Sequence, residues 1–218
     1  MVELYTPEQR KLQEDFGTEQ LADAHNAIIV SEDIPDDHAA FISSRDFFFL
    51  STVNHLGEPT VSYKGGAPGF VRVIDSTTLV FPSYDGNGMF LSMGNIADTA
   101  KIGLLFMDFE TPHRVRVQAS ASIVTDSALL ESFPGAQMVV RAVVDSAFVN
   151  CGRYIHRHQR VSSSEFVPDA QGNQPYPAWK RIDLLQPILP EADQGRAESD
   201  GGTITAEEYM QRVQRGEP

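Results

Sequence analysis

Apolar residues gather along this chain in short runs that predict β-strands joined by turns. The clearest run, residues 47–53 (F-F-F-L-S-T-V), is aromatic and β-branched and therefore favours a buried strand. Residues 114–124 alternate between apolar and polar side chains, which indicates a strand with one buried face. Further strands are predicted at residues 60–64, 70–74, 78–82, 102–107 and 137–148. Because little helix separates these strands, the pattern predicts a mainly β protein, a β-barrel with flanking helices.

Helices are predicted at both ends of the chain and at one point between the strands. Thr6 followed by Pro7 is typical of a helix start. Near the C-terminus, Thr205 and Glu208 form a capping pattern before an amphipathic stretch that ends near residue 214. Other helices are expected at residues 18–27, 36–44 and 89–98.

These boundaries divide the chain into three predicted parts. Residues 1–45 form a helical segment that packs on the barrel, residues 46–188 form the barrel, and residues 189–218 form an acidic tail with a short helix. Within that tail, residues 190–202 are polar and acidic, so we expect them to be mobile.

Two glycine-rich bends suggest a ligand site, at residues 64–69 (K-G-G-A-P-G) and 84–88 (Y-D-G-N-G). Glycine lets backbone N–H groups approach a ligand, and successive N–H groups can form an anion-binding concavity. The helix predicted after the second bend would add the positive end of its dipole, and Lys64, Ser83 and Ser92 would add side-chain donors. The pattern indicates a small molecule that carries a phosphate, and the alternative is that both bends are only hairpin turns. Neither P-loop spacing nor G-x-G-x-x-G after a strand is present.

The charge of the chain limits its partners. A formal net charge of −13 argues against a general nucleic-acid surface or an anionic-membrane surface, so a small-molecule partner is expected. One stretch, residues 153–160, is a local exception, and we call it the basic segment. An anionic ligand would explain its five residues, which are Arg153, His156, Arg157, His158 and Arg160.

Cysteine and histidine indicate little additional chemistry. Cys151 is the only cysteine, which excludes an intrachain disulfide and predicts a reducing, cytoplasmic location. Neither a secretory signal nor an apolar run of membrane-spanning length is expected. Cys151 is predicted to be a packed thiol rather than a nucleophile, because the sequence pairs no base with it. His156 and His158 would share one face of a strand, but no carboxylate or cysteine motif completes a set of ligands, so no metal site is predicted.

The order of these pieces resembles the pyridoxamine 5′-phosphate oxidase-like family, the FMN-binding split β-barrels. The resemblance covers about residues 47–123, and residues 151–157 (C-G-R-Y-I-H-R) are similar to a downstream motif of an uncharacterised branch of that family. It implies a split antiparallel β-barrel of the FMN-binding type. The pieces that carry it are F-F-F-L-S-T-V-N-H-L-G-E-P-T-V-S, Y-K-G-G-A-P-G-F-V-R-V-I-D, T-L-V-F-P-S-Y-D-G-N-G-M-F-L-S-M-G-N-I, K-I-G-L-L-F-M-D-F and R-V-R-V-Q-A-S-A-S-I.

The resemblance also implies a homodimer with FMN at the subunit interface. The flavin ring would lie against the backbone of Phe81, Pro82 and Ser83. By position, the cofactor's phosphate and ribityl contacts fall on Ser62, Lys64, Ser83, Asp85, Asn87, Gly88, Ser92 and Asn95. The candidates for completing the site from a partner chain are Arg116, Gln118, Arg153, Tyr154 and Trp179. From the residues alone, Trp179 is equally consistent with a core position and with ring stacking.

Two features of the family are missing. Enzymes that oxidise pyridoxamine phosphate carry an Arg-Lys pair near the start of the short helix, whereas residues 88–92 (G-M-F-L-S) contain no basic residue. The tail also lacks the family's substrate-binding signature, so oxidation of the vitamin itself is not expected. The resemblance therefore implies an FMN-dependent oxidoreductase, and the basic segment suggests a small anionic substrate; no catalytic residue is assigned. A flavin-binding redox sensor or carrier without turnover, and the same fold with F420 or haem, remain alternatives.

Overall fold

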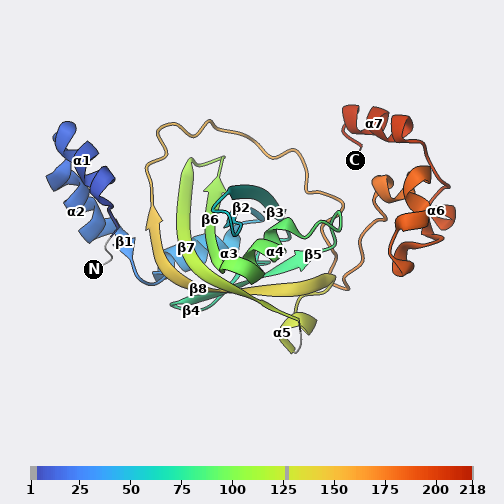
Figure 1. Cartoon of the computed structure of the whole chain (residues 1–218), viewed down its shortest axis with the longest axis horizontal. Helices are drawn as coiled ribbons and strands as arrows, with labels where there is room; N and C mark the ends of the chain where they lie inside the picture. The colour runs from blue at the N-terminus through green and yellow to red at the C-terminus, as the bar shows by residue number, and fades with distance from the viewer. Residues whose placement is uncertain (1–3, 126–127, 218) are drawn as a thin grey trace. The chain divides into compact units, whose positions relative to one another are not determined.

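The computed structural model describes residues 4–125 and 128–217, so the outer ends of the first and third predicted parts lie outside the described residues. The chain forms two compact units (Figure 1). The first unit contains Met1–Ser163 and Val167–Gly172, and the second contains Ser164–Phe166 and Asn173–Pro218. The three-part division expected from the sequence stays a prediction.

One antiparallel sheet forms the body of the first unit. The order of its strands is β3-β2-β6-β7-β8-β5-β4, with β1 paired to β8. This confirms the mainly β prediction, and the boundaries differ from those expected by at most two residues. The strands are β1 (Val30–Ser31), β2 (Phe47–Val53), β3 (Pro59–Gly65), β4 (Arg72–Asp75), β5 (Thr78–Tyr84), β6 (Lys101–Asp108), β7 (His113–Val124) and β8 (Ala136–Val149).

The sheet is rolled, so that strands far apart in its order meet across the core. The ring centroids of Phe48 in β2 and Phe81 in β5 lie 5.0 Å apart, although three strands separate β2 from β5 in the sheet. Phe48 also packs against Phe106 of the neighbouring β6, at 5.2 Å. Figure 1 shows β7 and β8 curving along the sheet. Among the described residues no ladder joins the edge strands β3 and β4, so the roll remains open between them.

The period of two along each strand explains which side chains fill this core. In β2, Phe48, Leu50 and Thr52 are fully buried, whereas the residues between them are only partly buried. Successive side chains of a strand point to opposite faces. The rolled sheet therefore has an inner face, which carries the core, and an outer face.

Among the described residues, five helices belong to the first unit, and the first of them starts as the sequence predicts. Thr6 caps the first helix, because its Oγ1 accepts a hydrogen bond from Gln9 N and Gln9 Oε1 accepts one from Thr6 N. No helix among the described residues is long and apolar enough to cross a membrane. The helices are α1 (Pro7–Asp15), α2 (Glu19–Ile29), α3 (Asp36–Ser44), α4 (Leu91–Thr99) and α5 (Ala128–Glu131).

The second unit is organised around a buried ion pair. Lys180 Nζ lies 2.7 Å from Asp193 Oδ2, and both side chains are at least nine-tenths buried. The Tyr176 hydroxyl donates to the carbonyl oxygen of Asp193. The expectation of a mobile stretch at residues 190–202 is therefore wrong, because a charged residue of that stretch is the buried centre of this unit. Around it lie the 3₁₀ turns Ala178–Arg181, Asp183–Ile188 and Glu191–Asp193 and the helices α6 (Arg196–Ser199) and α7 (Ala206–Gln214).

We expect Lys180→Ala to destabilise this unit by about 3–5 kcal/mol, because it leaves the Asp193 carboxylate buried without its ammonium partner. Urea unfolding followed by the fluorescence of Trp179, the single tryptophan, would report the change. A double variant, Lys180→Met with Asp193→Leu, is the control and should recover most of the loss, since it removes both charges together. An unchanged unfolding midpoint in Lys180→Ala would contradict the role of this pair.

Candidate functional site

The polar residues of β3 lie on the inner face of the rolled sheet. In the β2–β3 ladder, Ser62 is opposite Leu50 and Lys64 is opposite Phe48. Directly opposite residues of an antiparallel pair project to the same face. Since Leu50 and Phe48 belong to the core, an edge strand brings a hydroxyl and an ammonium to the inner side.

Helix α4 is tied to this hairpin by side-chain hydrogen bonds. The hydroxyl oxygens of Ser92 and Ser62 lie 2.9 Å apart. Asn95 Nδ2 donates to Thr52 Oγ1 at 3.0 Å, and Thr52 in turn shares a hydrogen bond of 3.0 Å with Thr60. The structure thus brings together three residues predicted for the site, Ser62, Ser92 and Asn95.

The N-terminus of α4 is open. Phe90, which precedes the helix, has a left-handed backbone (φ 49°), and no side chain in the described ranges caps the helix. The preceding turn is stabilised by a local hydrogen bond, which Asn87 Oδ1 accepts from Met89 N, and Gly88 within it has a left-handed φ of 76°. The first N–H groups of a helix have no partner within it and carry a partial positive charge. This end of α4 can therefore accept an anion.

Lys64 is a half-buried cation beside this helix–hairpin junction. Burial lowers the pKa of its ammonium below the ordinary lysine value. Within the part of the chain that the structure describes, the ammonium has no ion-pair or hydrogen-bond partner. A partly desolvated charge is costly unless it is paired, so an anionic ligand at this position would stabilise the site.

Among the described residues, the end of β5 has a neighbouring strand on one side only. The β4–β5 ladder ends at the Arg72–Val80 pair, whereas β5 continues to Tyr84. Phe81 and Ser83 are both buried, while their backbone has no strand on the β4 side among the described residues. A planar ligand could lie along this edge.

Comparison with known proteins assigns the chain to a family. The family model for pyridoxamine 5′-phosphate oxidase matches residues 34–161, which is more than half of the chain. The chain belongs to this family. Its sheet is accordingly the split β-barrel expected from the sequence, with the split between β3 and β4.

Solved structures similar to this family member match about half of its length. HupZ from Group A Streptococcus is 22% identical over 53% of this chain and 93% of its own, with a TM-score of 0.45. A putative pyridoxamine 5′-phosphate oxidase from Lactobacillus delbrueckii is 22% identical over 54% and 95%, with a TM-score of 0.44. An FMN-binding protein from Syntrophomonas wolfei is 12% identical over 64% and 97%, with a TM-score of 0.42. No curated protein matches the chain.

Arg116 and Gln118 lie on the opposite face of the barrel wall from Lys64. They alternate along β7 with Val117, which is fully buried in the core. The Arg116 guanidinium lies 5.5 Å from the ring centroid of Phe148, and burial lowers the pKa of this arginine. Gln118 Oε1 accepts a hydrogen bond from Ser146 Oγ. The structure therefore separates these two candidates from the inner-face residues of the same chain.

Other candidates lie outside the helix–hairpin junction. Asp85 is exposed and accepts a hydrogen bond of 3.1 Å from Gln137 Nε2. Tyr154 is 85% exposed, and the Arg153 guanidinium lies 5.7 Å from the centroid of its ring. Trp179 belongs to the second unit.

Cys151 differs from its expected role. It is exposed rather than packed, so that expectation is wrong. Hydrogen bonds from the Arg153 N–H and from Arg153 Nε, whose nitrogen lies 3.1 Å from Sγ, lower the pKa of the Cys151 thiol. The sequence showed the neighbouring arginine but not that its side chain folds back onto the sulfur.

Gly66, in the first glycine-rich bend, has a packing role that the sequence did not reveal. A Cβ at this position would lie 2.4 Å from Cγ of Phe70, which is buried in the core. The bend passes directly over the ring, and only glycine leaves room for it. At this position packing is sufficient to explain the glycine.

We expect Gly66→Ala to destabilise the first unit by about 1–3 kcal/mol, the usual cost of forcing extra volume into a packed site. Gly86→Ala, in the second bend, is the matched control, because a Cβ there meets no atom within 4 Å and the backbone φ is not left-handed. Thermal unfolding of the two variants beside the wild-type chain gives the comparison. Equal losses in both variants would contradict the packing explanation.

Proposed function

We propose that this family member binds FMN through the junction of β3 and α4 and serves as an FMN-dependent oxidoreductase. The observation that carries the proposal is the half-buried Lys64 ammonium, which has no anionic partner in the described residues. Lys64 follows Ser62 by two residues on the same face of β3, and Ser62 contacts Ser92 in the first turn of α4, whose N-terminus has no side-chain cap. A phosphate monoester would supply the missing negative charge. Family membership supports flavin as the remainder of the ligand.

Each part of the cofactor has residues suited to hold it. Lys64 and the first N–H groups of α4 would bind the phosphate, with Ser62 and Ser92 as hydroxyl donors. The ring would lie along the backbone edge of Phe81, Pro82 and Ser83 on the side where no strand pairs with them among the described residues. Bound FMN supplies hydride-transfer chemistry, and the protein then orients a substrate beside the ring.

The basic segment favours an anionic small molecule as the substrate. Arg153 is exposed and has no carboxylate partner in the described ranges, so its charge is available to a ligand. The exposed, unpaired Cys151 supports a reducing, cytoplasmic location.

The test is a pair of titrations, with FMN and with riboflavin, which lacks the phosphate. We expect Lys64→Ala to weaken FMN binding about thirtyfold, roughly 2 kcal/mol for a charge-assisted hydrogen bond, and to leave riboflavin binding unchanged. Quenching of flavin fluorescence would measure both affinities. The matched control is Lys101→Ala, which removes an exposed lysine at the start of β6.

Equal FMN affinity in wild type and Lys64→Ala would refute the phosphate assignment. If the wild-type chain does not bind FMN, the assignment of FMN as the cofactor is refuted, and F420 and haem would then be screened. A chain that binds FMN but does not cycle with donors and acceptors would be a sensor or carrier.

We propose further that two copies of the chain form the complete site as a homodimer. Lys64 projects to the inner face and Arg116 to the outer face, so one chain cannot bring both to one ligand. In a two-fold dimer the outer face of one copy can meet the β3–α4 junction of the other. The site would then lie at the interface.

Mixing two variants tests this arrangement. We expect Lys64→Ala and Arg116→Ala each to weaken FMN binding in a pure dimer, because every site then lacks one contact. A mixed dimer should contain one intact site, since both substitutions fall together in the other site. Recovery of wild-type affinity after mixing and exchanging subunits supports the shared site, whereas uniformly weak binding places both residues in the same chain's site. Sedimentation of the wild-type chain establishes the dimer independently.

A further inference from the structure

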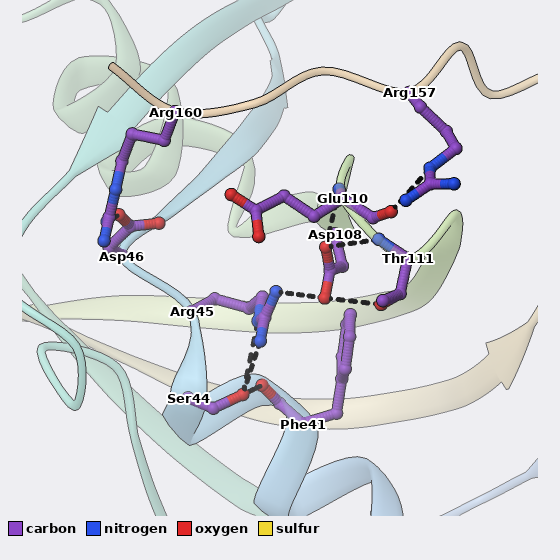
Figure 2. Close-up of polar contacts among 9 residues, drawn as sticks. All are labelled: Phe41, Ser44, Arg45, Asp46, Asp108, Glu110, Thr111, Arg157 and Arg160. Carbon is purple, nitrogen blue, oxygen red and sulfur yellow. Dashed lines mark hydrogen bonds and ion pairs between the residues drawn. The ribbon is translucent and has the colours of Figure 1, made fainter. Parts of the chain in front are cut away.

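The basic segment contacts the barrel at three points, and Figure 2 shows the two that involve Arg157 and Arg160. Arg157 Nε donates to the carbonyl oxygen of Glu110 at 3.0 Å, and His158 N donates to that of Phe109 at 3.1 Å. Arg160 forms an ion pair with Asp46. Two arginines that the sequence assigned to an anionic ligand thus have partners within the chain.

The turn that the basic segment contacts, residues 108–111, is stabilised by its own hydrogen bonds. Asp108, at the end of β6, accepts hydrogen bonds from the backbone N–H groups of Glu110 and Thr111 and from the Thr111 hydroxyl. Its carboxylate also lies 3.0 Å from Arg45 Nη1 (Figure 2). Arg45 and Asp46 are consecutive, so one short stretch before β2 contacts both the turn and the basic segment.

Asp46 also connects the basic segment to the predicted phosphate bend. Its carboxylate pairs with Arg160, while its carbonyl oxygen accepts a hydrogen bond of 2.9 Å from Gly66 N. Gly66 follows Lys64 by two residues. A single residue therefore links the basic segment to the backbone that carries the Lys64 ammonium.

Stacked rings support the same connection on the outer face. The ring of Phe47 stacks on Tyr63 at 5.3 Å and on Phe109 at 5.8 Å. Phe109 meets the imidazole of His158 edge-on at 5.1 Å. Tyr63 directly precedes Lys64, so this series of ring contacts is a second connection between the basic segment and the bend.

We propose that Arg160 and Asp46 are positioning residues for Lys64, and that this end of the basic segment holds the 64–66 bend rather than binding a ligand. The ion pair fixes Asp46, the Asp46 carbonyl fixes Gly66, and the fixed bend keeps the Lys64 side chain on the inner face. This inference rests on the proposed FMN function. Its physical link can be measured without any ligand.

The experiment compares wild type with Arg160→Ala, Arg160→Lys and the control Arg141→Ala, which removes an exposed arginine of β8. Hydrogen exchange of the Gly66 amide in the ligand-free protein is the first readout. We expect about fivefold faster exchange in Arg160→Ala, the scale set by a partly exposed ion pair, with recovery in Arg160→Lys and no change in the control.

Flavin affinity is the second readout. We expect Arg160→Ala to weaken FMN binding about fivefold, to leave riboflavin binding unchanged, and to have no further effect in a Lys64→Ala background. A merely structural role would weaken both flavins and would add to the effect of Lys64→Ala.

Two results would overturn the inference. One is an unchanged rate of hydrogen exchange at the Gly66 amide in Arg160→Ala. The other is a faster exchange rate in that variant together with an unchanged affinity for FMN. A wild-type chain that fails to bind FMN refutes the proposed function and with it the role for Lys64, while the exchange readout still decides whether Arg160 holds the bend.

Discussion

The register between β2 and β3 determines where the polar groups of this site point. Lys64 is opposite Phe48 and Ser62 is opposite Leu50, and both partners are core residues. Because side chains alternate along a strand, a slip of one residue would turn Lys64 and Ser62 to the outer face. It would also bring Tyr63, which is 63% exposed, against the core. The burial of Phe48 and Leu50 thus fixes the ammonium and the hydroxyl on the inner side.

The fold could be predicted largely from the sequence because its strands alternate or are strongly apolar. The run Phe47–Val53 has the predicted bounds, and the cap at Thr6 forms as its residues indicate. Strand β4 shows the limit of this reasoning. It begins at Arg72, two residues later than predicted, because Phe70 turns back into a bend and donates to the carbonyl oxygen of Ala67. Only the folded bend shows that the Phe70 ring packs against Gly66.

The candidate site was only partly accessible to sequence reasoning. Ser62, Ser92 and Asn95 could be grouped because one family pattern contains all three. The partners of Arg157 and Arg160 lie 47 and 114 residues away in the chain, and no local pattern reveals them. The same limit applies to residues 190–202, whose acidic composition suggested mobility. Lys180, 13 residues from Asp193, makes that region a folded centre instead. The partners that charged side chains find far along the chain, whether backbone carbonyls or opposite charges, are therefore what the sequence alone does not reveal.

The missing Arg-Lys pair defines what kind of phosphate site the chain can form. With basic residues absent from positions 88–92, Lys64 is the one cation that the β3–α4 junction contributes among its described residues. The remaining donors are neutral, namely the N–H groups at the start of α4 and the hydroxyls of Ser62 and Ser92. A helix terminus contributes roughly 0.3–1 kcal/mol at an exposed position and up to about 2 kcal/mol when partly buried. Its contribution thus depends on keeping water away from the junction. In the proposed site the single half-buried charge of Lys64 must therefore supply the cationic contact to the phosphate. This makes the orientation of Lys64, which its bend determines, more important than the number of basic residues nearby.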